Sequence, residues 1–198
     1  MSRLSPAEFG RSTAWALLVA GSLACALAPA IALAECTPSR VQEADLAYGT
    51  AKDFLDNQRW LAAIPSLESA LSICDEHVPT LQALAMAYRQ AGDLHKARGD
   101  SLKGAGDAAG AESAQQQAAA LWTKSRGAYA KLVAIPKREP EASDYAGYGL
   151  TLVRLKDYTN ARATYLKARA KLPRDCEVLF NLGVLHMAAQ DFRSSVET

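Results

Sequence analysis

The chain has 198 residues, of which 49% are hydrophobic and 22% charged, with 22 basic and 21 acidic side chains. The formal net charge of +1 gives no basic excess that would favour nucleic acid or an anionic membrane as a partner. A chain of this length can form one domain with a continuous core.

The N-terminal segment is typical of a secretory signal peptide. A weakly basic start precedes an uncharged, alanine-rich run over residues 14–34, and Ala32-Leu33-Ala34 matches the small-x-small pattern that signal peptidase cuts. We therefore expect residues 1–34 to be cleaved and residues 35–198 to be exported, into the periplasm if the source is a Gram-negative bacterium. The mature chain would hold 20 basic and 20 acidic residues and would not insert into a membrane. Anchoring by an uncleaved signal is the alternative, because the run could span a bilayer.

Four segments share a helical pattern in which large and small side chains alternate along one face. Such side chains, spaced three and four residues apart, lie on the same side of a helix. The best copy contains Tyr158, Ala161, Tyr165 and Ala168, with Pro173 after it. The others contain Trp60, Ala63, Leu67 and Ala70, then Leu94 and Ala97, and finally Phe192 and Ser195, where the last repeat remains incomplete. The spacing from Trp60 to Leu94, and again from Tyr158 to Phe192, is 34 residues.

A second helical pattern precedes each of these copies and predicts a partner helix. Short turns at residues 55–59, 90–93, 154–157 and 188–191 separate the two patterns, so each unit is predicted to be helix, turn, helix. Small residues in both partners allow the helices to approach closely, and large residues fill the space towards the next unit. The members of the second pattern that we expect in the repeat core are Ala51 and Phe54, then Leu84, Ala85 and Tyr88, then Gly149, and then Leu182 and Gly183.

These positions resemble the tetratricopeptide repeat (TPR), which has a 34-residue helix–turn–helix unit. The resemblance covers about residues 42–104 and 140–198. It implies an all-α fold, a right-handed superhelical solenoid of four to five antiparallel hairpins with a degenerate middle unit. A generic alanine-rich bundle is the alternative, although nothing in a plain bundle requires a return after 34 residues.

The middle of the chain, about residues 104–140, does not repeat cleanly. Gly104, Gly106 and Gly110 are expected to interrupt any helix there, and a helical pattern resumes near Ala111. We interpret this irregular segment as a degenerate unit with one shortened and one elongated helix. A flexible insertion around residues 104–117 is the alternative.

Three cysteines follow the predicted cleavage site. Cys36 precedes the first predicted helix and Cys74 ends its partner helix, so hairpin packing brings them together despite a separation of 38 residues. The sequence therefore predicts a Cys36–Cys74 disulfide, as is usual in an oxidising compartment. Cys176 begins the fourth unit and is expected to remain free.

The residues predict binding rather than catalysis. The chain contains no glycine-rich phosphate loop, no G-x-S-x-G motif and no clustered metal ligands, so we expect a non-catalytic protein without cofactor or metal. In helical repeats of this kind, the first helix of each hairpin lines a concave face. A peptide or protein partner is expected there, on side chains that the repeat pattern does not use. They are Tyr48, Lys52, Arg89, Gln90, Arg154 and Asn181.

The sequence also fits two other interpretations of what the whole protein is. The chain fits the N-terminal repeat region of a longer envelope protein whose activity lies downstream. It also fits a lipoprotein-type assembly factor lipidated at Cys25, although Ser22-Leu23-Ala24 lacks the usual large aliphatic residue three places before that cysteine. The incomplete C-terminal repeat would leave an apolar edge, so self-association through that edge is a further expectation.

Overall fold

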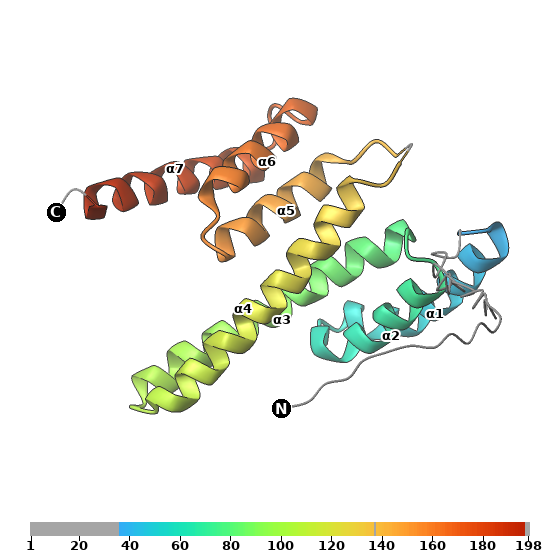
Figure 1. The fold of residues 1–198 in the computed structure, drawn as a ribbon, viewed down its shortest axis with the longest axis horizontal. Helices are drawn as coiled ribbons and strands as arrows, with labels where there is room; N and C mark the ends of the chain where they lie inside the picture. The colour runs from blue at the N-terminus through green and yellow to red at the C-terminus, as the bar shows by residue number, and fades with distance from the viewer. Residues whose placement is uncertain (1–35, 137, 197–198) are drawn as a thin grey trace, which may run out of the picture. The chain divides into compact units, whose positions relative to one another are not determined.

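The computed structural model describes residues 36–136 and 138–196, and the predicted signal peptide, with Cys25, lies outside these ranges. The described residues form seven α-helices and no strand (Figure 1). The helices are α1 (Pro38–Asp56), α2 (Trp60–Ile73), α3 (Val78–Gly104), α4 (Ala108–Val133), α5 (Ala142–Arg154), α6 (Tyr158–Lys171) and α7 (Cys176–Val196). The all-α prediction is therefore confirmed.

Each helix packs against the next along the chain, so that α1–α2, α3–α4 and α5–α6 form three hairpins. Alternate helices also contact one another, because α1 contacts α3, α3 contacts α5, and α5 contacts α7. The first helices of successive hairpins therefore share a continuous surface.

Two of the predicted turns form where the sequence places them. Gln58 and Lys156 adopt positive φ angles of 55° and 61°, which reverses the chain between α1 and α2 and between α5 and α6. The second turn leads directly into an N-cap, where the Asp157 side chain accepts a hydrogen bond from the Asn160 backbone N–H.

The turn predicted at residues 90–93 is wrong, because α3 is one helix of 27 residues. Gly92 is needed here for packing rather than for a turn. A Cβ atom at this position would lie 2.5 Å from the Trp122 Nε1 atom, so α4 can approach α3 only because the side chain is absent. The neighbouring Ala91 is fully buried, which also favours a continuous helix over an exposed turn.

The turn predicted at residues 188–191 is also wrong, because α7 continues from Cys176 to Val196. The segment Ala188-Ala189-Gln190-Asp191 contains no glycine or proline, and alanine is the best helix former. The described chain thus holds three hairpins and a single helix α7, rather than four to five hairpins.

The middle of the chain is more regular than expected. Residues 108–133, which lie in the segment expected to be irregular, form α4, and the connection from α3 is only residues 105–107. Gly106, with φ of 86°, provides the reversal, and the Asp107 side chain caps α4 at the Gly110 N–H. Figure 1 shows the resulting long α3–α4 pair, which replaces both the unit of unequal helices and the flexible insertion.

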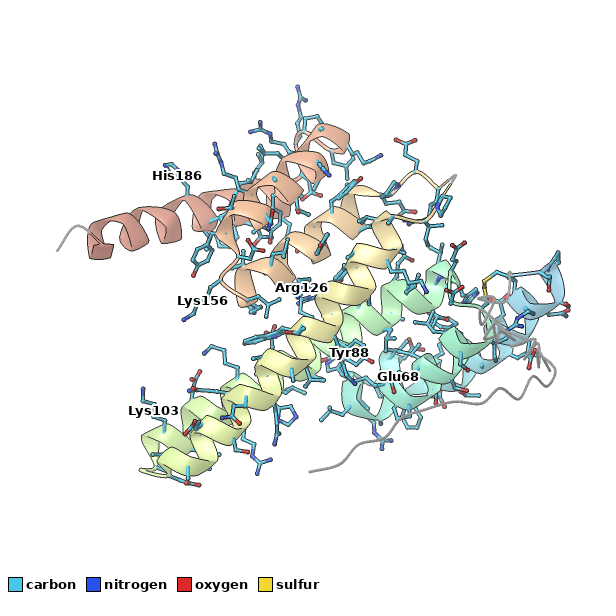
Figure 2. The ribbon with its side chains drawn as sticks, in the orientation of Figure 1. Glu68, Tyr88, Lys103, Arg126, Lys156 and His186 are labelled. Carbon is cyan, nitrogen blue, oxygen red and sulfur yellow. A yellow bond between two sulfur atoms is a disulfide. The ribbon has the colours of Figure 1, made fainter. Side chains whose placement is uncertain are left out.

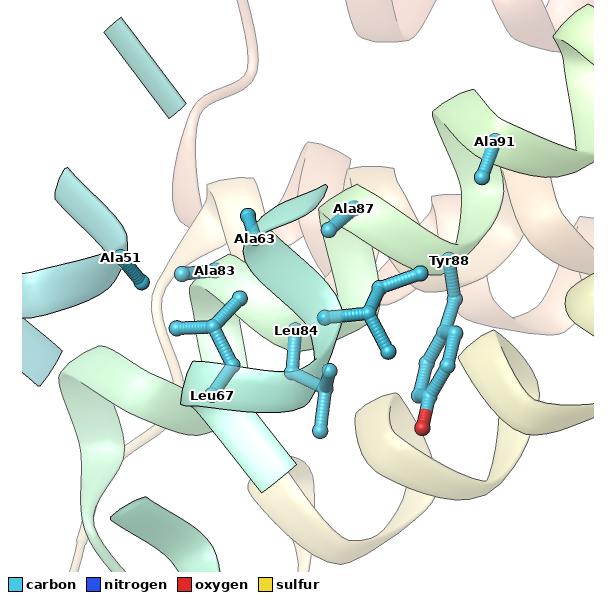
Figure 3. Close-up of a cluster of buried hydrophobic side chains, with 9 residues drawn as sticks. Ala51, Ala63, Leu67, Ala83, Leu84, Ala87, Tyr88 and Ala91 are labelled. Carbon is cyan, nitrogen blue, oxygen red and sulfur yellow. The ribbon is translucent and has the colours of Figure 1, made fainter. Parts of the chain in front are cut away.

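Small residues mark the points where the helices approach most closely. The first core cluster lies between α1, α2 and α3 and includes Ala51, Ala63, Leu67, Leu84 and Tyr88 (Figure 3). Alanines at these contacts lose all solvent exposure. They are Ala44, Ala51, Ala63, Ala70, Ala85, Ala87, Ala91, Ala161 and Ala168.

Gly149 has the same role between α5 and α6. A Cβ atom at this position would lie 3.0 Å from the ring of Tyr165, which is itself fully buried. Tyr165 joins Leu152, Ala161 and Leu185 in a core cluster that connects α5, α6 and α7. The Tyr165 ring of α6 therefore packs directly against Gly149 of α5, which brings the two helices close together.

The other expected core positions are less buried. Phe54, Trp60, Tyr158 and Leu182 are half-buried, and Ala97, Pro173 and Gly183 are exposed. Ala97 lies in the C-terminal part of α3, where α4 is the neighbouring helix. Its side chain is exposed to solvent rather than packed against another helix.

Candidate partner-binding surfaces

The six side chains expected to bind a partner come from α1, α3, α5 and α7, which contact one another in series. Lys52 on α1 is exposed, whereas Gln90 on α3 and Asn181 on α7 are half-buried. Tyr48 packs against the first core cluster and meets the His77 ring edge-on, with 6.4 Å between ring centroids. Tyr48 is therefore partly used for packing.

Arg89 and Arg154 lie close together because both bind Asp93. Arg154 donates from Nε to Asp93 Oδ1 over 2.7 Å and from Nη2 to Oδ2 over 3.3 Å. Arg89 Nη1 lies 3.9 Å from Oδ2, and Trp122 Nε1 also donates to Oδ1 over 3.2 Å. This Asp93 cluster joins α3, α4 and α5, so the two guanidinium groups are engaged within the fold.

The surroundings of Arg89 are mostly buried. Its side chain is 14% exposed, and its Nε atom has no hydrogen-bond partner among the described residues. Burial raises the pKa of the nearby Tyr129 hydroxyl, and the positive charge of Arg89 opposes that rise. Burial likewise raises the pKa of Tyr165, whose hydroxyl also lacks a partner among the described residues. Both tyrosines are therefore neutral packing groups at physiological pH.

Asp144 forms a second buried cluster that the repeat pattern did not indicate. It is 2% exposed, and Arg138 Nη2 donates to its Oδ2 over 2.6 Å. Gln82 Nε2 donates to Oδ1 over 2.8 Å, and the backbone N–H of Glu141 donates to Oδ2 over 2.8 Å. Asp144 thus connects α3, the loop before α5, and α5 itself.

Cys36, Cys74 and His77 are used structurally. The Cys36 and Cys74 sulfurs lie 2.10 Å apart, at disulfide distance, as the sequence predicts, and Cys176 is exposed and free. His77 is buried and shares hydrogen bonds with Thr80 and Asp45. Among the residues that the structure describes, no group of three or more potential ligands could hold a metal ion.

A groove of about 430 Å³ lies between α4 and α6, above α5. Over their described lengths α4 and α6 do not contact each other, so both flank the α5 helix. Tyr148 and Leu152 of α5 form the floor, and Arg126 stands on the α4 side. Asn160, Thr164 and Lys167 stand on the α6 side. We call this feature the α4–α6 groove. No signal in the sequence indicated it, because it depends on how far apart two non-adjacent helices lie.

Comparisons with other proteins add no assignment to this geometry. Over the described residues, none of the helices is sufficiently long and apolar to cross a membrane. A scan of protein-family models and a search of curated proteins both found no match to this chain.

Proposed function

We propose that the chain is an exported, non-catalytic scaffold of TPR type that binds a peptide or protein segment on the surface formed by α1, α3, α5 and α7. The observation that carries the proposal is the serial contact between these alternate helices. In stacked helical hairpins such a surface is the concave binding face. A right-handed superhelix over residues 35–198 is part of this proposal.

Two hairpins support the TPR assignment most directly. The α1–α2 and α5–α6 pairs have short turns and small residues at their closest approach, with Ala51 and Ala63 in one pair and Gly149 and Ala161 in the other. The long α3–α4 pair and the straight α7 depart from a regular repeat. We therefore propose a TPR-like stack with two irregular members.

Export is supported by the disulfide. A Cys36–Cys74 pair at bonding distance is compatible with an oxidising compartment, such as the periplasm. The alternatives keep the same fold and change its context: a repeat region of a longer envelope protein, a Cys25 lipoprotein, or a chain held by its uncleaved signal.

The test is capture of a partner on the inner surface. Arg89 and Arg154 are unsuitable for charge reversal because Asp93 would then face new negative charges. Lys52→Glu is better, since Lys52 is exposed, and Lys103→Glu at the tip of the α3–α4 hairpin is the matched control (Figure 2). We expect Lys52→Glu to lower recovery of the captured protein at least about tenfold, as for a hot-spot residue, with Lys103→Glu unchanged. Equal recovery by both variants would count against the inner surface.

Self-association through α7 is the second part of the proposal. Phe180 and Met187 are 70% and 60% exposed, and a Cβ at Gly183 would contact nothing within 4 Å, unlike at Gly149. These residues lie on one face of α7 and form an apolar stripe. A second copy of this stripe is the expected occupant, because antiparallel pairing across Gly183 would place Phe180 of one copy near Met187 of the other.

Light scattering after size exclusion should therefore show a concentration-dependent dimer. Phe180→Glu should shift it to monomer, because a buried carboxylate would have no partner at the interface. Leu46→Glu alters an equally exposed leucine on α1 and should leave the dimer intact. A monomer at all concentrations for the unaltered chain would disprove this part.

A further inference from the structure

The α4–α6 groove combines an aromatic floor with cations on both walls. Leu152 is almost fully buried and Tyr148 half-buried, so the accessible part of the floor is the Tyr148 side chain, with its ring and its hydroxyl. Arg126 and Lys167 are both exposed and stand on opposite sides (Figure 2 labels Arg126).

The other lysines of these two helices pair with carboxylates, whereas Arg162 and Arg169 of α6 have no acidic partner among the described residues. On α4, Lys124 pairs with Glu68 and Lys131 pairs with Asp75, and on α6, Lys171 pairs with Glu139. Within the described part of the chain, neither Arg126 nor Lys167 pairs with an acidic side chain. Lys167 instead lies over the Tyr145 ring, with its Nζ atom 5.7 Å from the centroid, which holds its stem on α5.

The one acidic residue in the groove is already engaged. Asp157 caps α6, accepting from the Asn160 N–H over 3.3 Å and from Asn160 Nδ2 over 2.8 Å. The Thr164 hydroxyl donates to the Asn160 carbonyl over 2.7 Å. Arg126 and Lys167 together with Asp157 give the groove a net charge of +1. The Asp157 carboxylate is held by its hydrogen bonds at the start of α6.

We propose that the α4–α6 groove is a second binding site, which takes an acidic segment of a partner protein. An apolar side chain of that segment would pack on the Tyr148 ring, and flanking carboxylates would face Arg126 and Lys167. A peptide satisfies both the Tyr148 ring and the cations, whereas a nucleic acid would meet only two positive charges for its phosphates. The walls of the groove come from α4 and α6, the second helices of their hairpins, which are not part of the inner surface. The groove and the inner surface share only the helix α5, which forms the floor.

The test is fluorescence polarisation of residues 35–198 with a fluorescein-labelled peptide of alternating glutamate and leucine. We expect Arg126→Gln and Lys167→Gln each to weaken binding about fivefold, the effect of losing one partly exposed ion pair. The affinity should fall further as ionic strength rises. Ala163→Trp, on the exposed rim of the groove, should block binding without altering charge.

Two controls make the result decisive. Lys103→Gln removes an exposed cation at the C-terminal end of α3 and should not change the affinity. An oligothymidylate of the same net charge should bind much more weakly than the peptide. The proposal is overturned if the peptide does not bind, if Lys103→Gln weakens it as much as Arg126→Gln, or if the oligonucleotide binds equally well. Circular dichroism confirms that each variant is folded.

Discussion

Replacing Asp144 with alanine is expected to lower the free energy of unfolding by about 3–5 kcal/mol, the usual effect of breaking a buried ion pair. The carboxylate is 2% exposed and accepts hydrogen bonds from Arg138, Gln82 and the Glu141 backbone. Its removal leaves the Arg138 guanidinium, only 15% exposed, without its charge partner. Urea unfolding followed by circular dichroism measures the loss.

The matched control is Asp100→Ala. Asp100 pairs with Lys96 over 2.5 Å, but both side chains are more than half exposed. Such a pair contributes about 0–1 kcal/mol, so this variant should unfold close to the unaltered protein. A loss for Asp144→Ala no larger than that for Asp100→Ala would show that the Asp144 cluster does not hold α3 and α5 together.

The two regular hairpins could be predicted from sequence because local signals agree there. The turn expected at 154–157 coincides with the end of α5 at Arg154 and the start of α6 at Tyr158. The turn expected at 55–59 lies between α1 and α2 in the same way. In both places the small residues at helical spacing are the ones that pack against a large neighbour.

The sequence does not predict that α3 is continuous, because a glycine can mark either a turn or a close contact between two helices. Gly92 followed by Asp93 suggests a turn, and the same pair serves a close helix contact. Only the position of Trp122, thirty residues further on, decides between them. Trp122 packs on Gly92 and donates a hydrogen bond to Asp93, so both residues belong to the middle of a helix.

The candidate binding surfaces are harder to predict from sequence than the fold. Whether a cation is free or paired with a carboxylate depends on residues far away in the sequence. The helical pattern places Arg89 and Arg154 on first helices of hairpins, but it carries no information that Asp93 binds both. Conversely, Arg126 and Lys167 gave no signal, and only the separation of α4 and α6 brings them to one groove.

Loss of the Cys36–Cys74 disulfide is expected to lower the free energy of unfolding by about 3–4 kcal/mol. The bond closes a loop with a sequence separation of 38 residues, and restricting a loop of this size in the unfolded chain accounts for that magnitude. The double variant Cys36→Ser/Cys74→Ser, compared with the oxidised protein in urea, measures it. Cys176→Ser is the control, since Cys176 is exposed and free.

The effect should be concentrated at the N-terminal hairpin. The bond joins Cys36, two residues before α1, to the C-cap of α2, and Arg40 Nε donates to the Ile73 carbonyl over 2.7 Å beside it. Without the bond, the start of α1 retains this contact and the His77–Asp45 pair as its polar ties to the following segments. Hydrogen exchange should therefore accelerate in α1 and remain unchanged in α5 and α6. Equal acceleration in all helices would mean that the disulfide stabilises the whole stack as one cooperative unit.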